Sequence, residues 1–201
     1  MLTRNDPARG QRGLTLVELM VTIALLSLLL GLAMPSFGLW TRNAKVRTVS
    51  DSLITGVRLA QSEAVRRNRQ VVLFLTSTKT CGSSTTASAN AAYWAVRTVA
   101  LVNGEAVETV QCGVLADTAE GVTLTGPTAL CFNSAGRQVA NADPGVGGSA
   151  CTLAASGVST YDVAMPMGDR PLRVLISLSG QARMCDPART LSATNTDGCP
   201  A

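Results

Sequence analysis

Residues 12–40, RGLTLVELMVTIALLSLLLGLAMPSFGLW, decide the fold because they contain the longest uncharged stretch of the chain. No charged side chain occurs from position 19 to position 41. A helix of that length would be about 35 Å long, enough to cross the hydrocarbon core of a bilayer. One acid, Glu18, lies at the edge of the run, and no basic residue inside the run could neutralise it. We therefore expect a membrane helix whose buried carboxylate needs a partner from elsewhere.

The motif around this acid, G-L-T-L-V-E-L, resembles the processing site of type IV pilins and of the pseudopilins of type II secretion. The resemblance implies that a prepilin peptidase cleaves after Gly13 and that the new first residue, Leu14, is N-methylated. Family members usually carry Phe where this chain has Leu14. Cleavage would expose an amine one helical turn from Glu18, and this amine, in the same or a neighbouring subunit, would neutralise the carboxylate. Residues 1–13 are then a cytoplasmic leader, and Leu14 and Glu18 mediate assembly.

Two other interpretations of the N-terminus remain open. The three arginines before Gly13 and the apolar run could form an ordinary secretion signal with a cleavage site near residues 31–33. The position of Glu18 inside the apolar region and the length of that region speak against this. The run could also be a plain single-pass anchor, which would leave Glu18 unexplained.

The helical pattern continues beyond the membrane segment. Six apolar residues recur at spacings of three and four and form one stripe: Val46, Val49, Leu53, Val57, Ala60 and Ala64. Because this pattern resumes directly after Pro35, we expect that proline to kink the helix and not to end it. The sequence predicts one helix from about residue 14 to about residue 68, with a transmembrane part at 14–40 and an amphipathic part at 41–69.

The remaining residues, 70–201, predict a β-rich periplasmic domain. Strands are expected at 70–77, 92–102, 105–111, 121–125, 129–133, 158–165 and 171–179. The second and third of these flank Asn103-Gly104, a dipeptide typical of two-residue hairpin turns. Long loops are expected at 81–92 and 140–157, and a polar tail after Gly180. The predicted fold class is α+β, with a long N-terminal helix followed by an antiparallel sheet domain.

All six cysteines lie beyond the predicted membrane segment, where the chain would face an oxidising compartment. They are Cys81, Cys112, Cys131, Cys151, Cys185 and Cys199. An even number in this setting is typical of disulfides, and six cysteines allow fifteen connectivities. Pairing of sequence neighbours, 81–112, 131–151 and 185–199, is the arrangement we expect. The chain contains no His and no C-x-x-C pair, so we expect no metal site.

Three further motifs are similar to those of the GspH/FimT/FimU branch, the minor pilins and pseudopilin H of type II secretion. They are A-x-x-x-A-V-R-R-N-R at 60–69, F-N-S-A-G-R at 132–137 and V-L-I-S-L-S-G-Q-A-R at 174–183. The resemblance implies assembly with other pilins through the N-terminal helix and an inner-membrane assembly platform as partner. The FimT-like members involved in DNA uptake carry a basic G-R-x-R element, which here keeps only its second arginine, Arg183.

Catalysis is not expected from this sequence. Without His there is no Ser-His or Cys-His pair, and no phosphate-binding glycine loop follows a strand. We expect Glu105 and Glu108 to be solvated. Arg66, Arg67 and Arg69 lie at the end of the predicted helix, where positive charge interacts favourably with the helix dipole. No cofactor is predicted.

The sequence therefore predicts a structural subunit, a minor pilin or pseudopilin of a type IV pilus or of a type II secretion pseudopilus, at its tip or initiation complex. The net charge of +4 falls to about +2 once the leader is removed, too small a surplus to indicate nucleic-acid binding by itself. The alternative is a FimT-like DNA-binding pilin, with Arg173, Arg183 and Arg189 as candidate contacts. The predicted location is the bacterial inner membrane, with one membrane pass and the C-terminal domain in the periplasm or on an extracellular pilus.

Overall fold

The computed structural model describes residues 15–80, 82–102, 104–115 and 119–200, without the side chains of residues 32–36. The predicted leader with Gly13 and Leu14 lies outside the described residues, as do Cys81 and Asn103. The chain divides into two compact units, residues 1–38 and residues 39–201.

One helix, α1, extends from Leu16 to Arg66. As predicted, the helix does not end at Pro35: the backbone is helical on both sides of the proline. Every described side chain from Leu16 to Gly31 is exposed, and the large apolar ones expose between 52% and 75% of their surface. Among the residues described here, no helical stretch is long and apolar enough to cross a membrane.

The first sheet has the strand order β3-β2-β1-β5-β6 and is antiparallel throughout. Its strands are β1 (Val71–Thr76), β2 (Tyr93–Thr98), β3 (Thr109–Val114), β5 (Ala129–Phe132) and β6 (Gln138–Val139). β1 is buried along its whole length because α1 covers one face of the sheet and loops cover the other. Its continuous apolar sequence, VVLFLT, is typical of a strand buried on both sides.

The second sheet has the order β10-β9-β8-β7-β4, with one parallel pair, β9 and β10. Its strands are β4 (Thr123–Thr125), β7 (Val158–Ala164), β8 (Leu172–Ser177), β9 (Ala182–Thr190) and β10 (Gly198–Cys199). The sequence predicted a polar tail where β9 lies, and this was wrong. The segment ARMCDPART lacks apolar alternation and contains Pro187, but β9 pairs with β8 only through residues 182–185, so the proline does not interrupt that ladder.

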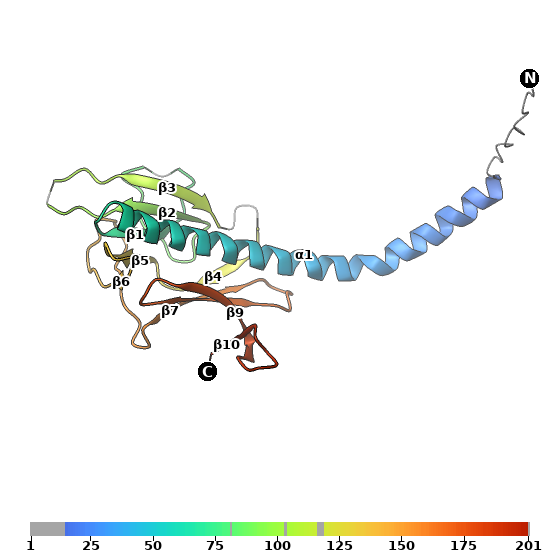
Figure 1. Ribbon diagram of the computed structural model, residues 1–201. Helices are drawn as coiled ribbons and strands as arrows, with labels where there is room; N and C mark the ends of the chain where they lie inside the picture. The colour runs from blue at the N-terminus through green and yellow to red at the C-terminus, as the bar shows by residue number, and fades with distance from the viewer. Residues whose placement is uncertain (1–14, 81, 103, 116–118, 201) are drawn as a thin grey trace, which may run out of the picture. The chain divides into compact units, whose positions relative to one another are not determined.

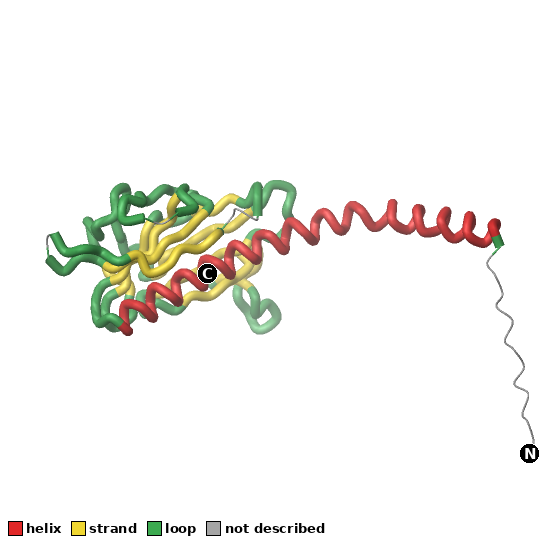
Figure 2. Tube along the Cα trace, turned by 90° about the horizontal axis from the view of Figure 1, so that it is seen from above, coloured by secondary structure: helices red, strands yellow, loops and turns green. Residues whose placement is uncertain are grey.

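The main core joins the helix to both sheets (Figure 1). The stripe predicted between Val46 and Ala64 is fully buried, each of its six residues exposing 1% or less. It packs with residues of the first sheet such as Leu73 and Trp94, and of the second such as Tyr161 and Ile176. Figure 2 shows the second half of α1 lying along the strands. The predicted α+β architecture is confirmed.

The hairpin of β2 and β3 forms, but its paired strands are shorter than predicted. β2 ends at Thr98 and β3 begins at Thr109, while Glu105 N donates to Val102 O (3.2 Å) across the expected turn position. Glu108 N donates to the Thr98 side-chain oxygen (2.9 Å), and Glu105 is held by Arg69 from the end of the helix. These contacts hold the residues that lie between the paired strands and the turn.

A smaller core lies on the outer face of the first sheet, beneath the loops at 82–92 and 140–157. Cys131 and Cys151 form a disulfide there, and Ala87 N donates to Gly147 O (2.8 Å), which joins the two loops. Arg97 is buried in this region with 1% exposure, and it donates to Gly82 O (2.6 Å) and lies over the Phe74 ring. Desolvation lowers the pKa of Arg97.

The structure contains two of the expected cysteine pairs, Cys131–Cys151 and Cys185–Cys199. Cys112 is also disulfide-bonded, and its expected partner Cys81 lies outside the described residues. Each described disulfide joins residues that are close in the chain, 20 and 14 positions apart. The pairs therefore close local loops and do not cross-link the two sheets.

Candidate functional site: the helix and its attachment to the sheets

Glu18 lies in the first turn of α1. Its backbone N–H donates to the side-chain oxygen of Thr15 (3.2 Å), so Thr15 caps the helix. Thr15 and Glu18 have the T-x-x-E spacing of a capping box. An acid in the first turn also interacts favourably with the positive end of the helix dipole. Glu18 can therefore support helix initiation as well as the charge pairing that the sequence suggested.

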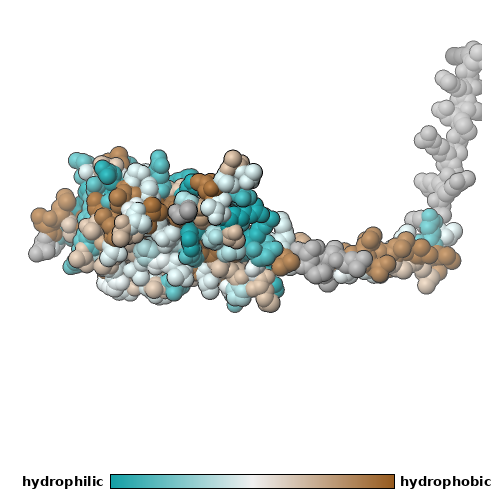
Figure 3. All heavy atoms as spheres, turned by 90° about the horizontal axis from the view of Figure 1, so that it is seen from below, coloured by the Kyte–Doolittle hydropathy of each residue, from teal (hydrophilic) through white to brown (hydrophobic). Residues whose placement is uncertain are grey.

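The first half of α1 presents an apolar surface on all sides. In Figure 3 its described residues are predominantly brown, whereas the surface of the sheet domain is mixed. Its exposed apolar side chains are Leu16, Val17, Leu19, Met20, Val21, Ile23, Leu25, Leu26, Leu28, Leu29 and Leu30. A helix that is apolar on every face belongs in a nonpolar environment. The sheet domain buries only the later stripe, from Val46 to Ala64.

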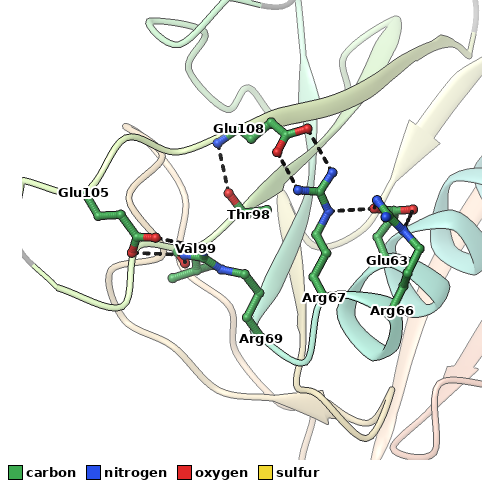
Figure 4. A network of polar contacts seen from close by, with 8 residues as sticks. All are labelled: Glu63, Arg66, Arg67, Arg69, Thr98, Val99, Glu105 and Glu108. Carbon is green, nitrogen blue, oxygen red and sulfur yellow. Dashed lines mark hydrogen bonds and ion pairs between the residues drawn. The ribbon is translucent and has the colours of Figure 1, made fainter.

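The end of α1 is attached to the β2–β3 connection by a network of ion pairs (Figure 4). Arg67 bridges two carboxylates, donating to Glu63 (2.7 Å) on the helix and through both terminal nitrogens to Glu108. Arg66 forms a bidentate pair with the same Glu63. This network joins the last turn of the helix to a segment some 40 positions later.

A second contact of this network involves Arg69, three positions after the end of the helix. Arg69 pairs with Glu105 (2.8 Å) and donates to the Val99 carbonyl. Glu105 in turn accepts the N–H of Leu101 (2.7 Å). Glu108 is exposed, as expected, with 61% of its side chain accessible, whereas Glu105 is half-buried. Both acids are ion-paired, which the sequence did not predict, because the fold brings their loop against the helix end.

These contacts shift the carboxylate pKa values downward. Hydrogen bonds from Arg66 and then Arg67 lower the pKa of Glu63 from 4.5 to about 2. Arg69 lowers the pKa of Glu105, and Arg67 lowers that of Glu108. The carboxylates are therefore held in their charged form, and the network remains intact over a wide pH range.

Gln61 connects the helix to both sheets with one amide group. Its side-chain nitrogen donates to Gly136 O (3.0 Å), in the turn after β5, and to Ser179 O (3.1 Å), in the turn after β8. Gly180 packs so closely here that a Cβ would lie 2.5 Å from the Gln61 amide and from Gly136 O. The three motifs at 60–69, 132–137 and 174–183, distant in sequence, thus meet at one point.

The arginines proposed for DNA binding have partners within the chain. Arg173 pairs with Asp162 (2.7 Å), and Arg189 with Asp186 and Asp197. Arg183 donates to Gly198 O (3.2 Å) and so connects β9 to β10. The structure therefore uses these side chains to hold the second sheet together.

In the part of the chain that the structure describes, no group of three or more His, Cys, Asp or Glu side chains could hold a metal ion. The described part of the chain thus combines an exposed apolar helical segment with a domain that packs against the second half of the same helix.

Two family models match the sequence. The prokaryotic N-terminal methylation motif matches residues 8–34, and the profile of the type II transport protein GspH matches residues 49–180. A search of curated proteins found no match.

Similar solved structures include minor pilins and pseudopilins. The Pseudomonas aeruginosa type IV minor pilin FimU is 15% identical (TM-score 0.48, over 74% of this chain and 96% of FimU). The Vibrio cholerae minor pseudopilin EpsH is 13% identical (TM-score 0.45, over 72% and 99%), and Escherichia coli GspH is 11% identical (TM-score 0.44, over 75% and 94%).

The GspH profile spans well over half of the chain, and the methylation motif precedes it in the sequence. The protein belongs to the GspH family of minor pilins and pseudopilins and carries the N-terminal methylation motif.

Proposed function

We propose that this protein is a minor pilin or pseudopilin subunit that is cleaved after Gly13, methylated at Leu14 and assembled through α1 into a type IV pilus or a type II secretion pseudopilus. We place it at the tip or initiation complex of the filament. The observation that carries this proposal is the contrast between the two halves of α1. The stripe from Val46 to Ala64 is buried by the sheets, whereas residues 16–31 expose apolar side chains on every face.

Leaving such a surface in water is costly. Each large apolar side chain of this size loses about 1.5–3 kcal/mol when it stays exposed, and eleven of them occur between Leu16 and Leu30. A subunit that first inserts in the inner membrane and then packs its helix against sister helices covers this surface at both stages. The proposed partners are other pilins, the prepilin peptidase and the inner-membrane assembly platform, with the sheet domain in the periplasm or on the filament.

The processing step can be tested at the N-terminus. Protein extracted from its native membrane should begin at N-methylated Leu14, as determined by N-terminal sequencing and intact mass. Gly13→Ser should leave the leader attached and give a heavier band. A wild-type chain that starts at Met1, or after a cleavage near residue 33, would refute the assignment.

The assembly role of Glu18 can be separated from its capping role. Glu18→Ala should be inserted and cleaved normally but incorporated poorly into filaments, because the carboxylate that pairs with the neighbouring amine is missing. Thr15→Ala is the matched control, since it removes the cap and keeps the acid. Incorporation should follow the order wild type, Thr15→Ala, Glu18→Ala. Normal incorporation of Glu18→Ala would eliminate the pairing argument.

The DNA-binding alternative remains a separate prediction. Binding at cellular salt needs several simultaneous phosphate contacts, and each of the three candidate arginines already has a partner in the chain. The purified protein should give no salt-sensitive gel shift. A shift that Arg183→Ala abolishes would favour a DNA receptor instead.

A further inference from the structure

The start of the sheet domain forms a composite surface from two distant segments. Residues 40–47 of α1 lie against the turn between β7 and β8, where Arg42 donates to Met167 O (3.2 Å) and Asn43 donates to Asp169 (2.7 Å). These contacts fix the turn on the helix, over 120 positions away in sequence. Trp40, Lys45, Met167 and Arg170 form what we call the rim.

Two rim residues present large apolar side chains to the exterior. Both lie in the second compact unit, residues 39–201, where Trp40 is 66% exposed and Met167 is 75% exposed. Met167 also has a left-handed backbone (φ 60°), which costs a non-glycine residue about 1–2 kcal/mol. An exposed methionine on a strained turn adds little to the stability of the domain, so its position has another explanation.

The other two rim residues are cations. Arg170 is exposed and Lys45 is half-buried, and neither forms an ion pair with another described residue. Of the nearby acids, Asp186 and Asp197 pair with Arg189, whereas Asp169 accepts from the neutral amide of Asn43 and keeps its negative charge. Beside the rim is a pocket of about 1030 Å³, lined by Arg47 and Arg170 and also by these three aspartates. Arg42, Lys45 and Arg170 together outnumber Asp169, so the positive surplus at the rim favours an anionic surface.

We infer that the rim docks on the headgroup layer of an anionic phospholipid bilayer, with Trp40 and Met167 at the interface and Lys45 and Arg170 on lipid phosphates. This rests on the proposed function, because the uncharged run ends at Thr41 and the rim starts where the chain would leave the hydrocarbon. Trp at that boundary and basic residues just beyond it are what a membrane interface favours. Each basic residue near an anionic surface contributes about 1 kcal/mol.

Docking would limit the tilt of the domain before assembly. The turn carrying Met167 is held to residues 42 and 43 of α1, so docking at Trp40 would bring Met167 to the same headgroup layer. Extraction into a filament would have to release the rim from the bilayer. Because only a few charges hold it there, the contact is weak enough to be reversible.

The test uses the full-length protein reconstituted in phosphatidylcholine vesicles, with and without phosphatidylglycerol, containing lipids brominated near the headgroup. Trp40→Phe serves as background, since the other tryptophan, Trp94, is 3% exposed in the core and stays shielded from the quencher. Met167→Trp places an indole on the rim. Leu101→Trp is the matched control, because Leu101 is 70% exposed on the β2–β3 connection, away from the rim.

Bromolipid should quench the indole added by Met167→Trp in phosphatidylglycerol vesicles and leave that added by Leu101→Trp unquenched. Adding Lys45→Gln and Arg170→Gln should lower the docked-to-undocked ratio by roughly tenfold or more, and high salt should act in the same direction. The control pair Arg58→Gln and Arg137→Gln, which removes the same charge from exposed positions elsewhere, should not.

Three results would overturn the inference. The first is equal quenching of the indoles at positions 167 and 101. The second is no quenching at position 167 in protein that resists carbonate extraction. The third is protection of the indole at position 167 by a second copy of the protein in place of lipid, visible as a dependence on protein density. Extraction of the wild-type protein by carbonate would instead contradict the proposed function.

Discussion

Gln61 and Gly180 show how single residues join this fold. The Gln61 amide reaches one carbonyl from each sheet, and the close approach of Gly180 is compatible only with a residue that has no Cβ. Gly180 also has a left-handed backbone, with φ of 84°. Two separate physical reasons therefore require glycine at this position.

Substitution can separate these two reasons. Gly180→Ala should destabilise the protein by about 2–4 kcal/mol, from backbone strain and from the overlap with Gly136 O and Gln61. Gly145→Ala is the control, since Gly145 has a similar φ of 74° and nothing within 4 Å of a new Cβ. It should cost only about 1–2 kcal/mol. Urea denaturation of the purified protein measures both, and equal losses would contradict the close-contact argument.

At the residue scale, the sequence showed which side chains are charged or apolar but not which distant residues they contact. Glu105 and Glu108 looked like ordinary loop acids because their arginines lie roughly 40 positions earlier, and no local spacing connects them. The motifs at 132–137 and 174–183 were visible, but their common contact with Gln61 was not. Helical and strand periodicities report which face is buried and carry no information on which distant polar groups meet.

At the scale of elements, the ion-pair network fixes the end of α1 to the β2–β3 connection. Arg67, 20% exposed, bridges Glu63 and Glu108, whereas Arg66, 63% exposed, contacts Glu63 alone. Arg67→Gln should therefore lower the free energy of unfolding by about 1 kcal/mol, and Arg66→Gln should lower it less. Thermal unfolding followed by circular dichroism tests this, and a larger loss for Arg66→Gln would show that the bridge to Glu108 adds nothing.

The same network makes stability depend on acid pH. Because the folded-state pKa of Glu63 is about 2 against an ordinary value of 4.5, folding favours the charged form. Its contribution is complete above the unfolded value and is lost as the pH falls from about 4.5 towards 2. Glu105 and Glu108, whose pKa values are also lowered, act in the same direction. Urea midpoints over this range should fall steeply in wild type and less steeply in Glu63→Gln, and parallel curves would contradict the assignment.

Most elements follow from sequence patterns, and the exceptions share one cause. The helix, its buried stripe and seven strands of the sheets were predicted within a few residues, because their apolar periodicity is strong. β6, β9 and β10 and the longer β2–β3 connection were missed, because pairing partners and ion pairs determine them. The pairing of β8 with residues 182–185 holds a polar segment as a strand that periodicity alone would not predict.

At the scale of the whole molecule, disulfides close the loops over a domain with few aromatic residues. Cys131–Cys151 fixes the loop that covers the outer face of the first sheet, and Cys185–Cys199 fixes the last strand. A disulfide closing a loop of this length contributes about 3 kcal/mol. Reduction should therefore lower the Tm by on the order of 10 °C, measured by calorimetry with and without reductant. Titration of all six thiols in the native, unreduced protein would refute the prediction.

The sequence by itself determined the class of the protein: one uncharged run with a single acid at its edge, an apolar stripe continuing the same helix, and six cysteines beyond it. These are local patterns, and local patterns need no knowledge of the fold. Only the tertiary structure decided which glutamates pair with Arg67 and Arg69, that Gln61 joins both sheets, and that Met167 lies beside the start of the domain. Such contacts join residues far apart in the chain, and their distances exist only after the sheets have packed against the helix.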